Sequence, residues 1–294
     1  MMTTPFFTVV LPTYNHAHFL GEAIESVLNQ VYTNFELLII DNYSIDNTDQ
    51  VIASFSDHRI RALKIHNNGV IAASRNMGII EAKGEWIAFL DSDDIWYSNK
   101  LLEVSKAIQS ASDVDVLCHN ELFINENSGR KTKHKHGPIN SSAYRILLID
   151  GNKLSTSSSV ISNKFVKNTN LFFRENKNLI TVEDYDFWLF CAKKGAKFYF
   201  IDEILGEYRM HSSNASQISE IYYKNLNFLI KDHCFKIQEF TIQKQELYEI
   251  VSVRVNLSYI KQLFRKRKYS KFLLETCKLL LFKSQPLFHF TFGS

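Results

Sequence analysis

The chain has 294 residues, of which 45% are hydrophobic and 22% are charged, so it can bury a sizeable core and is not intrinsically disordered. Its net charge of +3 is too small for an extended nucleic-acid surface, and we expect no nucleic-acid partner. Four scattered cysteines, the absence of a long apolar run and the lack of a secretory-signal pattern together indicate a cytoplasmic protein.

The first 90 residues alternate between short apolar runs and helical patterns. The apolar runs predict strands at residues 8–11, 37–40, 60–65 and 86–90. Helical periodicity at 17–30 and 70–82 places helices between them. Because strands that alternate with helices are joined by right-handed crossovers, we expect an α/β fold with a mostly parallel sheet sandwiched by helices.

The middle of the chain continues this pattern less regularly. The predicted elements are a helix at 99–111, a strand at 114–124, a Ser-rich strand or loop at 155–162, a helix at 184–194 and two strands at 197–201 and 204–210. Residues 125–142 are polar and rich in Lys, so we predict a surface loop in which His134 and His136 are solvated. The α/β domain is expected to span 1–213. Residues 219–282 contain neither Gly nor Pro, which predicts a helical C-terminal extension over 214–294.

Polar residues follow three of the predicted strands. The first strand ends in Pro12-Thr13-Tyr14-Asn15, the second in Asp41-Asn42 and the fourth in Asp91-Ser92-Asp93-Asp94. Ligands of open α/β sheets bind outside the carboxyl ends of the strands, so these side chains should line one crevice. The chain has no Gly-rich loop of the dinucleotide-binding or P-loop type, which counts against both classes. A bound diphosphate would then need Mn²⁺ or Mg²⁺, and the carboxylates of Asp91 and Asp93 suit such a hard cation.

In order along the chain, these residues resemble family 2 glycosyltransferases with the GT-A fold. The similarity runs through residues 9–48, 68–69, 73–76, 84–94 and 183–189. The resemblance implies an inverting enzyme that moves a sugar from a nucleoside diphosphate donor to an acceptor hydroxyl. It also suggests a glycan or lipid-linked acceptor, and bacterial surface polysaccharide assembly at the inner face of the plasma membrane.

The resemblance assigns the donor site residue by residue. It implies that Thr13, Tyr14 and Asp41 hold the nucleoside, with Asp41 facing the base. Arg75 would lie near the base and the diphosphate, and Asp91 would contact the ribose or the sugar.

The same resemblance implies that Asp93 binds the metal, that His211 joins it, and that Asp184 is the catalytic base. One departure is visible, because many relatives have an acidic residue where this chain has Asn42 and a Gly where it has Tyr43. The departure leaves the donor base open, with a UDP-sugar as the first expectation.

Structural interpretations stay open beside these roles. Residues 91–94 could cap the next helix, Asp41 could be a turn residue, and Arg75 could make an ordinary salt bridge. Acids at 183–186 favour a helix N-terminus, and the Ser-rich run is either acceptor-lining or a polar strand face. For the whole chain, the alternatives are a catalytically silent nucleotide-sugar-binding or scaffolding protein with the same fold and a nucleotidyltransferase. The second lacks the Gly- and Lys-rich loop expected for a triphosphate.

The C-terminal extension carries a basic stretch at residues 265–268. Apolar residues follow it at Phe272, Leu273, Leu274 and 279–282, with Phe288, Phe290 and Phe292 beyond them. A basic amphipathic helix can lie on an anionic membrane face. Packing onto the α/β domain or onto a second subunit of a homo-oligomer is the interpretation that we favour, with membrane contact confined to the basic stretch and the last aromatic residues.

Overall fold

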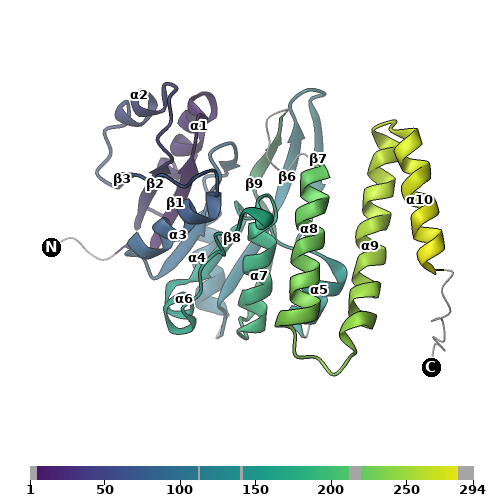
Figure 1. Cartoon of the computed structure of the whole chain (residues 1–294). Coiled ribbons are helices and arrows are strands. Elements are labelled where there is room, and N and C mark those ends of the chain that lie inside the picture. The colour runs from purple at the N-terminus through teal and green to yellow at the C-terminus, as the bar shows by residue number, and fades with distance from the viewer. Residues whose placement is uncertain (1–4, 112, 140–141, 212–219, 284–294) are drawn as a thin grey trace. The chain divides into compact units, whose positions relative to one another are not determined.

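The structure is a computed structural model that describes residues 5–111, 113–139, 142–211 and 220–283 (Figure 1). The chain divides into two compact units, Met1–Gln217 and Ile218–Ser294. We describe each unit by itself. The predicted boundary at 213 falls outside the described residues, so it stays a prediction.

The described part of the first unit contains one sheet of nine strands, in the order β3-β2-β1-β4-β8-β6-β9-β5, with β7 paired to β6. The strands are β1 (Phe7–Thr13), β2 (Phe35–Asp41), β3 (Ile60–Lys64), β4 (Trp86–Phe89), β5 (Ile95–Trp96), β6 (Val116–Asn125), β7 (Arg130–His134), β8 (Ser159–Ser162) and β9 (Phe198–Met210). The first four strands are mutually parallel, and β6 is parallel to β9. The predicted α/β fold with a mostly parallel sheet is confirmed.

Helices connect the strands and cover both faces of the sheet. They are α1 (Ala17–Leu28), α2 (Thr48–Ala53), α3 (Ile71–Glu81), α4 (Lys100–Ser110), α5 (Ala143–Asp150), α6 (Asn163–Thr169) and α7 (Glu183–Lys193), with a 3₁₀ turn at Lys177–Leu179. Strands β1, β2 and β4 are buried along their whole length, as expected for parallel strands covered on both sides.

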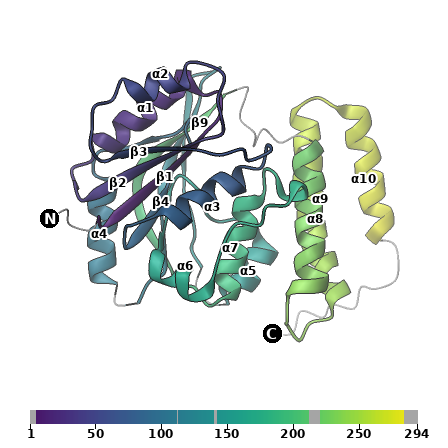
Figure 2. The same cartoon turned by 60° about the vertical axis from the view of Figure 1, so that its left-hand side comes forward.

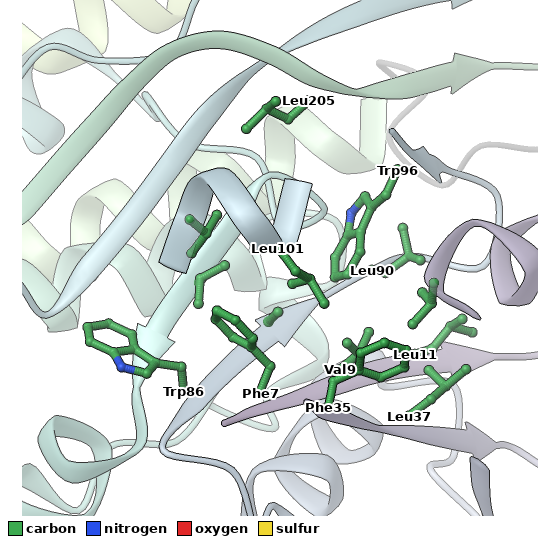
Figure 3. Close-up of a cluster of buried hydrophobic side chains, with 14 of the residues drawn as sticks. Phe7, Val9, Leu11, Phe35, Leu37, Trp86, Leu90, Trp96, Leu101 and Leu205 are labelled. Atoms are coloured by element: carbon green, nitrogen blue, oxygen red, sulfur yellow. The ribbon is translucent and has the colours of Figure 1, made fainter. Parts of the chain in front are cut away.

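Alternate residues of β1 point into two different cores. Val9 and Leu11 join a cluster with apolar residues of α1 and α4, part of which Figure 3 shows around Phe7, Leu37 and Leu90. Val10 points to the other face, where α3 packs against β1 (Figure 2). Gly78 of α3 lies so close that a Cβ atom there would overlap the Val10 side chain.

Two predictions for the middle of the chain are wrong. Residues 130–134 form strand β7, which pairs antiparallel with β6 through a turn that contains Gly129 at φ 65°. All residues of β7 are exposed, so the strand has no apolar alternation by which the sequence could reveal it. The two strands expected at 197–201 and 204–210 are one strand, β9, whose register against β6 shifts near Asn120.

The prediction of a solvated His136 is also wrong. Its side chain is only 5% exposed, and its Nε2 atom lies 2.8 Å from the buried Oε2 atom of Glu121. The hairpin of β6 and β7 brings these residues together, which their spacing in the sequence does not suggest.

The second unit is helical, which confirms the predicted character of the C-terminal extension. It contains α8 (Glu220–Asp232), a π-helical turn at His233–Ile237, α9 (Lys244–Arg265) and α10 (Tyr269–Lys283). Helix α9 packs against both α8 and α10, and the Tyr223 hydroxyl of α8 donates to Gln262 of α9 at 3.1 Å. In the part of the chain that the structure describes, every helix is too short or too polar to cross a membrane. Phe288, Phe290 and Phe292 lie outside the described residues.

Candidate active site

The carboxyl ends of β1, β2 and β4 lie along one edge of the sheet. Thr13 and Asp41 are register partners at the ends of β1 and β2. Asp91 follows β4, beyond the backbone hydrogen bond from Leu90 to Val10 of β1. The polar residues that the sequence places after separate strands therefore share this edge.

Arg75 of α3 joins two other elements at this edge. Its Nη2 atom donates to Asp91 Oδ1 and its Nη1 atom donates to Glu183 Oε1 of α7, both at 2.7 Å. The Arg75 side chain is only 4% exposed. Burial lowers the pKa of the guanidinium, but the carboxylates of Asp91 and Glu183 outweigh this effect and raise it above its ordinary value. Arg75 is thus a permanently charged, buried centre of the site.

Asp184 is the neighbour of Glu183 in the first turn of α7. It is half-buried, and its Oδ2 atom accepts a hydrogen bond from the Asn152 amide at 3.1 Å. Burial and the nearby charge of Glu183 raise the pKa of Asp184 to about 7, although Arg75 opposes them. A carboxylate with a pKa near neutrality is suited to accept a proton from a substrate hydroxyl.

Residues 91–94 form a tight turn, which we call the acidic turn. Asp93 is largely buried, and its Oδ2 atom lies 3.1 Å from His211 Nε2 at the end of β9. Burial and the charge of Asp91 raise the pKa of Asp93. Helix α4 begins well after the turn with Asn99 as its N-cap residue, so helix capping does not explain the acidic turn.

Asp94 has a structural role in the same turn. It is buried, accepts a hydrogen bond from the Ser157 hydroxyl at 2.5 Å, and accepts another from the Arg209 backbone N–H at 3.0 Å. Burial and the charge of Asp93 raise the pKa of Asp94 well above its ordinary value. Asp94 therefore faces the protein, whereas the side chains of Asp91 and Asp93 keep 28% and 15% of their surface exposed.

The chemistry of these groups fits Mn²⁺ or Mg²⁺. Asp91 and Asp93 offer carboxylate oxygens and His211 offers an imidazole nitrogen, which are ligands that such cations accept. Among the described residues, however, no three His, Cys, Asp or Glu side chains are grouped closely enough to hold a metal ion. A metal here would take its other ligands from substrate phosphates and water, as Mg²⁺ commonly does.

The residues assigned to the nucleoside form a second group along the edge. Tyr14 is 52% exposed, and the Thr13 hydroxyl is buried with no hydrogen-bond partner in the described structure. Asp41 is buried and accepts hydrogen bonds from the Ser44 backbone N–H and hydroxyl, while Lys64 lies 3.2 Å away. Asp41 is thus a turn residue, and its part in base recognition stays a prediction.

The structure explains the unusual pair Asn42 and Tyr43. The Asn42 side-chain oxygen accepts a hydrogen bond from the Asn67 backbone N–H at 2.9 Å, so it holds the loop after β3. Tyr43 has φ 50°, a conformation that favours glycine, and its ring stacks on His66 with centroids 3.8 Å apart.

Sequence reasoning did not identify Glu183, Ser157 or Arg209 as parts of this site. Glu183 pairs with Arg75, and Ser157 and Arg209 hold the acidic turn. The only signal for Glu183 was its position next to Asp184. For Ser157 the signal was its place in a Ser-rich run without an apolar face.

A curled, mostly parallel sheet with an acidic turn beyond β4 defines a GT-A type glycosyltransferase fold. The chain belongs to glycosyl transferase family 2, whose family model matches residues 8–179.

Relatives of known sequence agree with this assignment. The chain is 30% identical over 213 residues to an uncharacterized glycosyltransferase of Methanocaldococcus jannaschii, with 71% of this chain and 72% of the relative covered. It is 40% identical over 121 residues to the UDP-Glc:alpha-D-GlcNAc-diphosphoundecaprenol beta-1,3-glucosyltransferase WfgD of Escherichia coli. That match covers 41% of this chain and 47% of the relative. An uncharacterized glycosyltransferase of Rickettsia felis is 28% identical over 82% of this chain, which spans only 40% of that relative.

Solved structures show the same fold. S. aureus TarS 1-349 in complex with UDP-GlcNAc superposes with a TM-score of 0.65 at 20% identity, covering 85% of this chain and 71% of that one. The mannosyltransferase PcManGT from Pyrobaculum calidifontis, in complex with GDP-Man and Mn²⁺, gives a TM-score of 0.62 at 14% identity, with 97% and 77% covered.

Proposed function

We propose that this protein is an inverting glycosyltransferase that moves a sugar from a nucleoside diphosphate donor to an acceptor hydroxyl. The observation that carries the proposal is the half-buried carboxylate of Asp184, with a pKa of about 7, beside the Arg75 centre at the carboxyl edge of the sheet. Such a transfer needs a group that accepts the proton of the acceptor hydroxyl. It also needs charged groups that stabilise the departing diphosphate.

In the proposed reaction Asp184 takes the proton of the acceptor hydroxyl while the acceptor oxygen attacks the anomeric carbon of the donor. The bond from that carbon to the diphosphate oxygen breaks on the opposite face, so the configuration inverts in a single displacement. Arg75 keeps Asp91 and Glu183 neutralised and thereby lowers the repulsion that the diphosphate meets.

The charge balance of the site supports the proposed metal dependence. The four carboxylates of Asp91, Asp93, Glu183 and Asp184 share two buried arginines, since Arg75 pairs with Asp91 and Glu183 and Arg209 donates to the Asp93 carbonyl. This balance is unfavourable for a diphosphate unless a divalent cation is added. Bound through Asp93, with Asp91 and His211 at hand, Mn²⁺ or Mg²⁺ would supply the positive charge that neutralises the leaving group.

We further propose a UDP-sugar as the donor and a glycan or lipid-linked acceptor, in the assembly of a bacterial surface polysaccharide. The TarS complex holds UDP-GlcNAc, and the relative from E. coli is named for UDP-Glc and a diphosphoundecaprenol acceptor. TarS is only 20% identical to this chain, and the match to the E. coli relative covers 41% of this chain. Their names therefore indicate which substrates to test first.

A lipid-linked acceptor would bring the protein to the inner face of a membrane, and we propose that the basic stretch 265–268 makes a peripheral contact there. Within its own unit, α10 leaves Leu273 and Leu274 exposed. For these two side chains we propose packing onto the catalytic domain or onto a second subunit, with lipid contact as the alternative.

The direct test is a screen of nucleotide sugars scored by the release of free nucleoside diphosphate, with and without Mn²⁺. The proposal expects release that needs the metal and increases with an acceptor. Tight donor binding without release for any donor would instead indicate a catalytically silent binding protein. Release of pyrophosphate would indicate nucleotidyl transfer.

A further inference from the structure

We propose that Ser157 is a positioning residue that fixes the acidic turn for metal and diphosphate binding. The inference rests on the proposed function and concerns a residue that never faces the substrate. Ser157 lies in the turn that leads into β8, and it is 2% exposed.

The hydroxyl of Ser157 bonds to both ends of the acidic turn. It accepts a hydrogen bond from the Asp91 backbone N–H at 3.0 Å and donates one to Asp94 Oδ2 at 2.5 Å. The first bond holds the backbone of Asp91, before Asp93, and the second holds the side chain of Asp94, after it. The part of the turn that carries Asp93 is therefore held by a residue more than sixty positions away in the sequence.

Ser157 is itself held rigidly by its own carbonyl group. The carbonyl oxygen accepts hydrogen bonds from Lys100 Nζ and from Trp96 Nε1, both at 2.7 Å. Lys100 is completely buried, which lowers the pKa of its amino group well below the ordinary value, and its Nζ atom also lies 3.3 Å from the centroid of the Trp96 ring. Two buried donors on one carbonyl leave Ser157 little freedom to move, since breaking either bond would leave a buried polar group without a partner.

The opposite side of the turn is held by β9. Arg209 donates from its Nε atom to the Asp93 carbonyl at 2.5 Å and from its backbone N–H to Asp94 Oδ1 at 3.0 Å. Asp94 is thus fixed between Ser157 and Arg209. His211, which directly follows the same strand, contacts Asp93. Ser157 and Arg209 thus hold the turn on both sides of Asp93, and residues that position a metal ligand commonly change metal affinity by about 10- to 100-fold when removed.

This arrangement decides between the two interpretations of the Ser-rich run for its central residue. Both hydrogen bonds of the Ser157 hydroxyl go to the acidic turn. The hydroxyl therefore does not line an acceptor site, and it is not merely a polar group on the face of a strand. Ser159 provides a matched comparison two residues further on. It is equally buried, and its hydroxyl donates to the Ser155 carbonyl at 2.6 Å.

The experiment compares Ser157→Ala with Ser159→Ala. Each variant loses one buried hydroxyl, which makes two hydrogen bonds at Ser157 and one at Ser159, so both should lose stability but only Ser157→Ala should also lose affinity for Mn²⁺. Binding of Mn²⁺ in the presence of UDP is measured by calorimetry and by the shift in melting temperature. We expect Ser157→Ala to weaken this binding at least about tenfold, and Ser159→Ala to leave it close to wild type.

Steady-state kinetics give a second readout. We expect the donor KM and the half-saturating Mn²⁺ concentration to rise in Ser157→Ala, with a smaller change in kcat. If Ser157→Ala does not fold, Ser157→Cys leaves no cavity but replaces the hydroxyl by a slightly larger and weaker donor, and it should weaken binding in the same direction. Equal Mn²⁺ affinity in the Ser157 and Ser159 variants, or wild-type affinity in Ser157→Cys, would overturn the inference. Because binding is measured without turnover, a protein that binds Mn²⁺ and UDP but transfers no sugar would contradict the proposed function and not this inference.

Discussion

Replacing Asp184 with Asn tests the proposed base in two independent ways. The folded protein raises the pKa of Asp184 from its ordinary value of 3.8 to about 7. A carboxyl group whose pKa is raised on folding binds its proton more tightly in the native state. The ionised form therefore destabilises the fold, and this cost grows as the pH rises from about 4 to about 7.

The size of the effect follows from the two pKa values. Linkage gives a cost of ionisation that is about 2 to 3 kcal/mol larger at pH 8 than at pH 5. Asn cannot ionise, so the Asp184→Asn variant should gain stability relative to wild type by about this amount over the same interval. Any constant loss, such as a weaker contact with Asn152, cancels in the difference between the two pH values.

The assay is urea unfolding of both proteins at pH 5 and pH 8. Asp150→Asn, at an exposed carboxylate near the end of α5, controls for the change in net charge. The same Asp184 variant should lose at least about 10²-fold in kcat while it keeps its affinity for UDP and Mn²⁺. In wild type, kcat/KM should rise with pH through about 7, since only the ionised carboxylate accepts a proton. A stability difference that does not change with pH, together with near-normal turnover, would refute the assignment of the base.

Three further perturbations test other parts of the site and the extension. Asp93→Ala should abolish turnover and the rise in melting temperature that Mn²⁺ with UDP gives to wild type, and full activity in EDTA would contradict the role of the metal. Arg75→Met should cost about 3 kcal/mol in urea unfolding, because it leaves the buried Glu183 and the partly exposed Asp91 without their cation, and a loss under about 1 kcal/mol would contradict the buried ion pair. Charge reversal of residues 265–268 should abolish co-sedimentation with anionic vesicles at low salt, and vesicle binding that survives the reversal would exclude the basic stretch as the contact.

The strand ends could be predicted from the sequence because local patterns specify them. Buried parallel strands are continuous apolar runs, and a parallel sheet places their carboxyl ends on one edge whatever the connections between them. Asp41, Asp91 and Asp93 were found in this way. Their neighbours in the family motif then led to Arg75 and Asp184.

The partners of these residues could not be predicted, because they come from distant parts of the chain. Glu183 lies 108 residues from Arg75, and the Ser157 hydroxyl lies 66 residues from the Asp91 amide that it accepts from. Neither contact has a periodicity or a spacing by which to recognise it. Strand β7 was missed for a different reason, since an exposed edge strand buries nothing and shows no pattern.

Gly78 allows α3 to lie close enough to β1 for Arg75 to contact Asp91. Gly78 and Arg75 are three positions apart on α3 and therefore lie on neighbouring parts of the same helix surface. The guanidinium meets Asp91 because the helix axis comes as near to β1 as the absence of a Cβ atom allows. A single methyl group at position 78 would push α3 away from Val10 and draw the charge of Arg75 back from the carboxylates that it neutralises. The distance between α3 and β1, which is fixed in the apolar core, thus determines whether Arg75 reaches the carboxylates at the carboxyl ends of the strands.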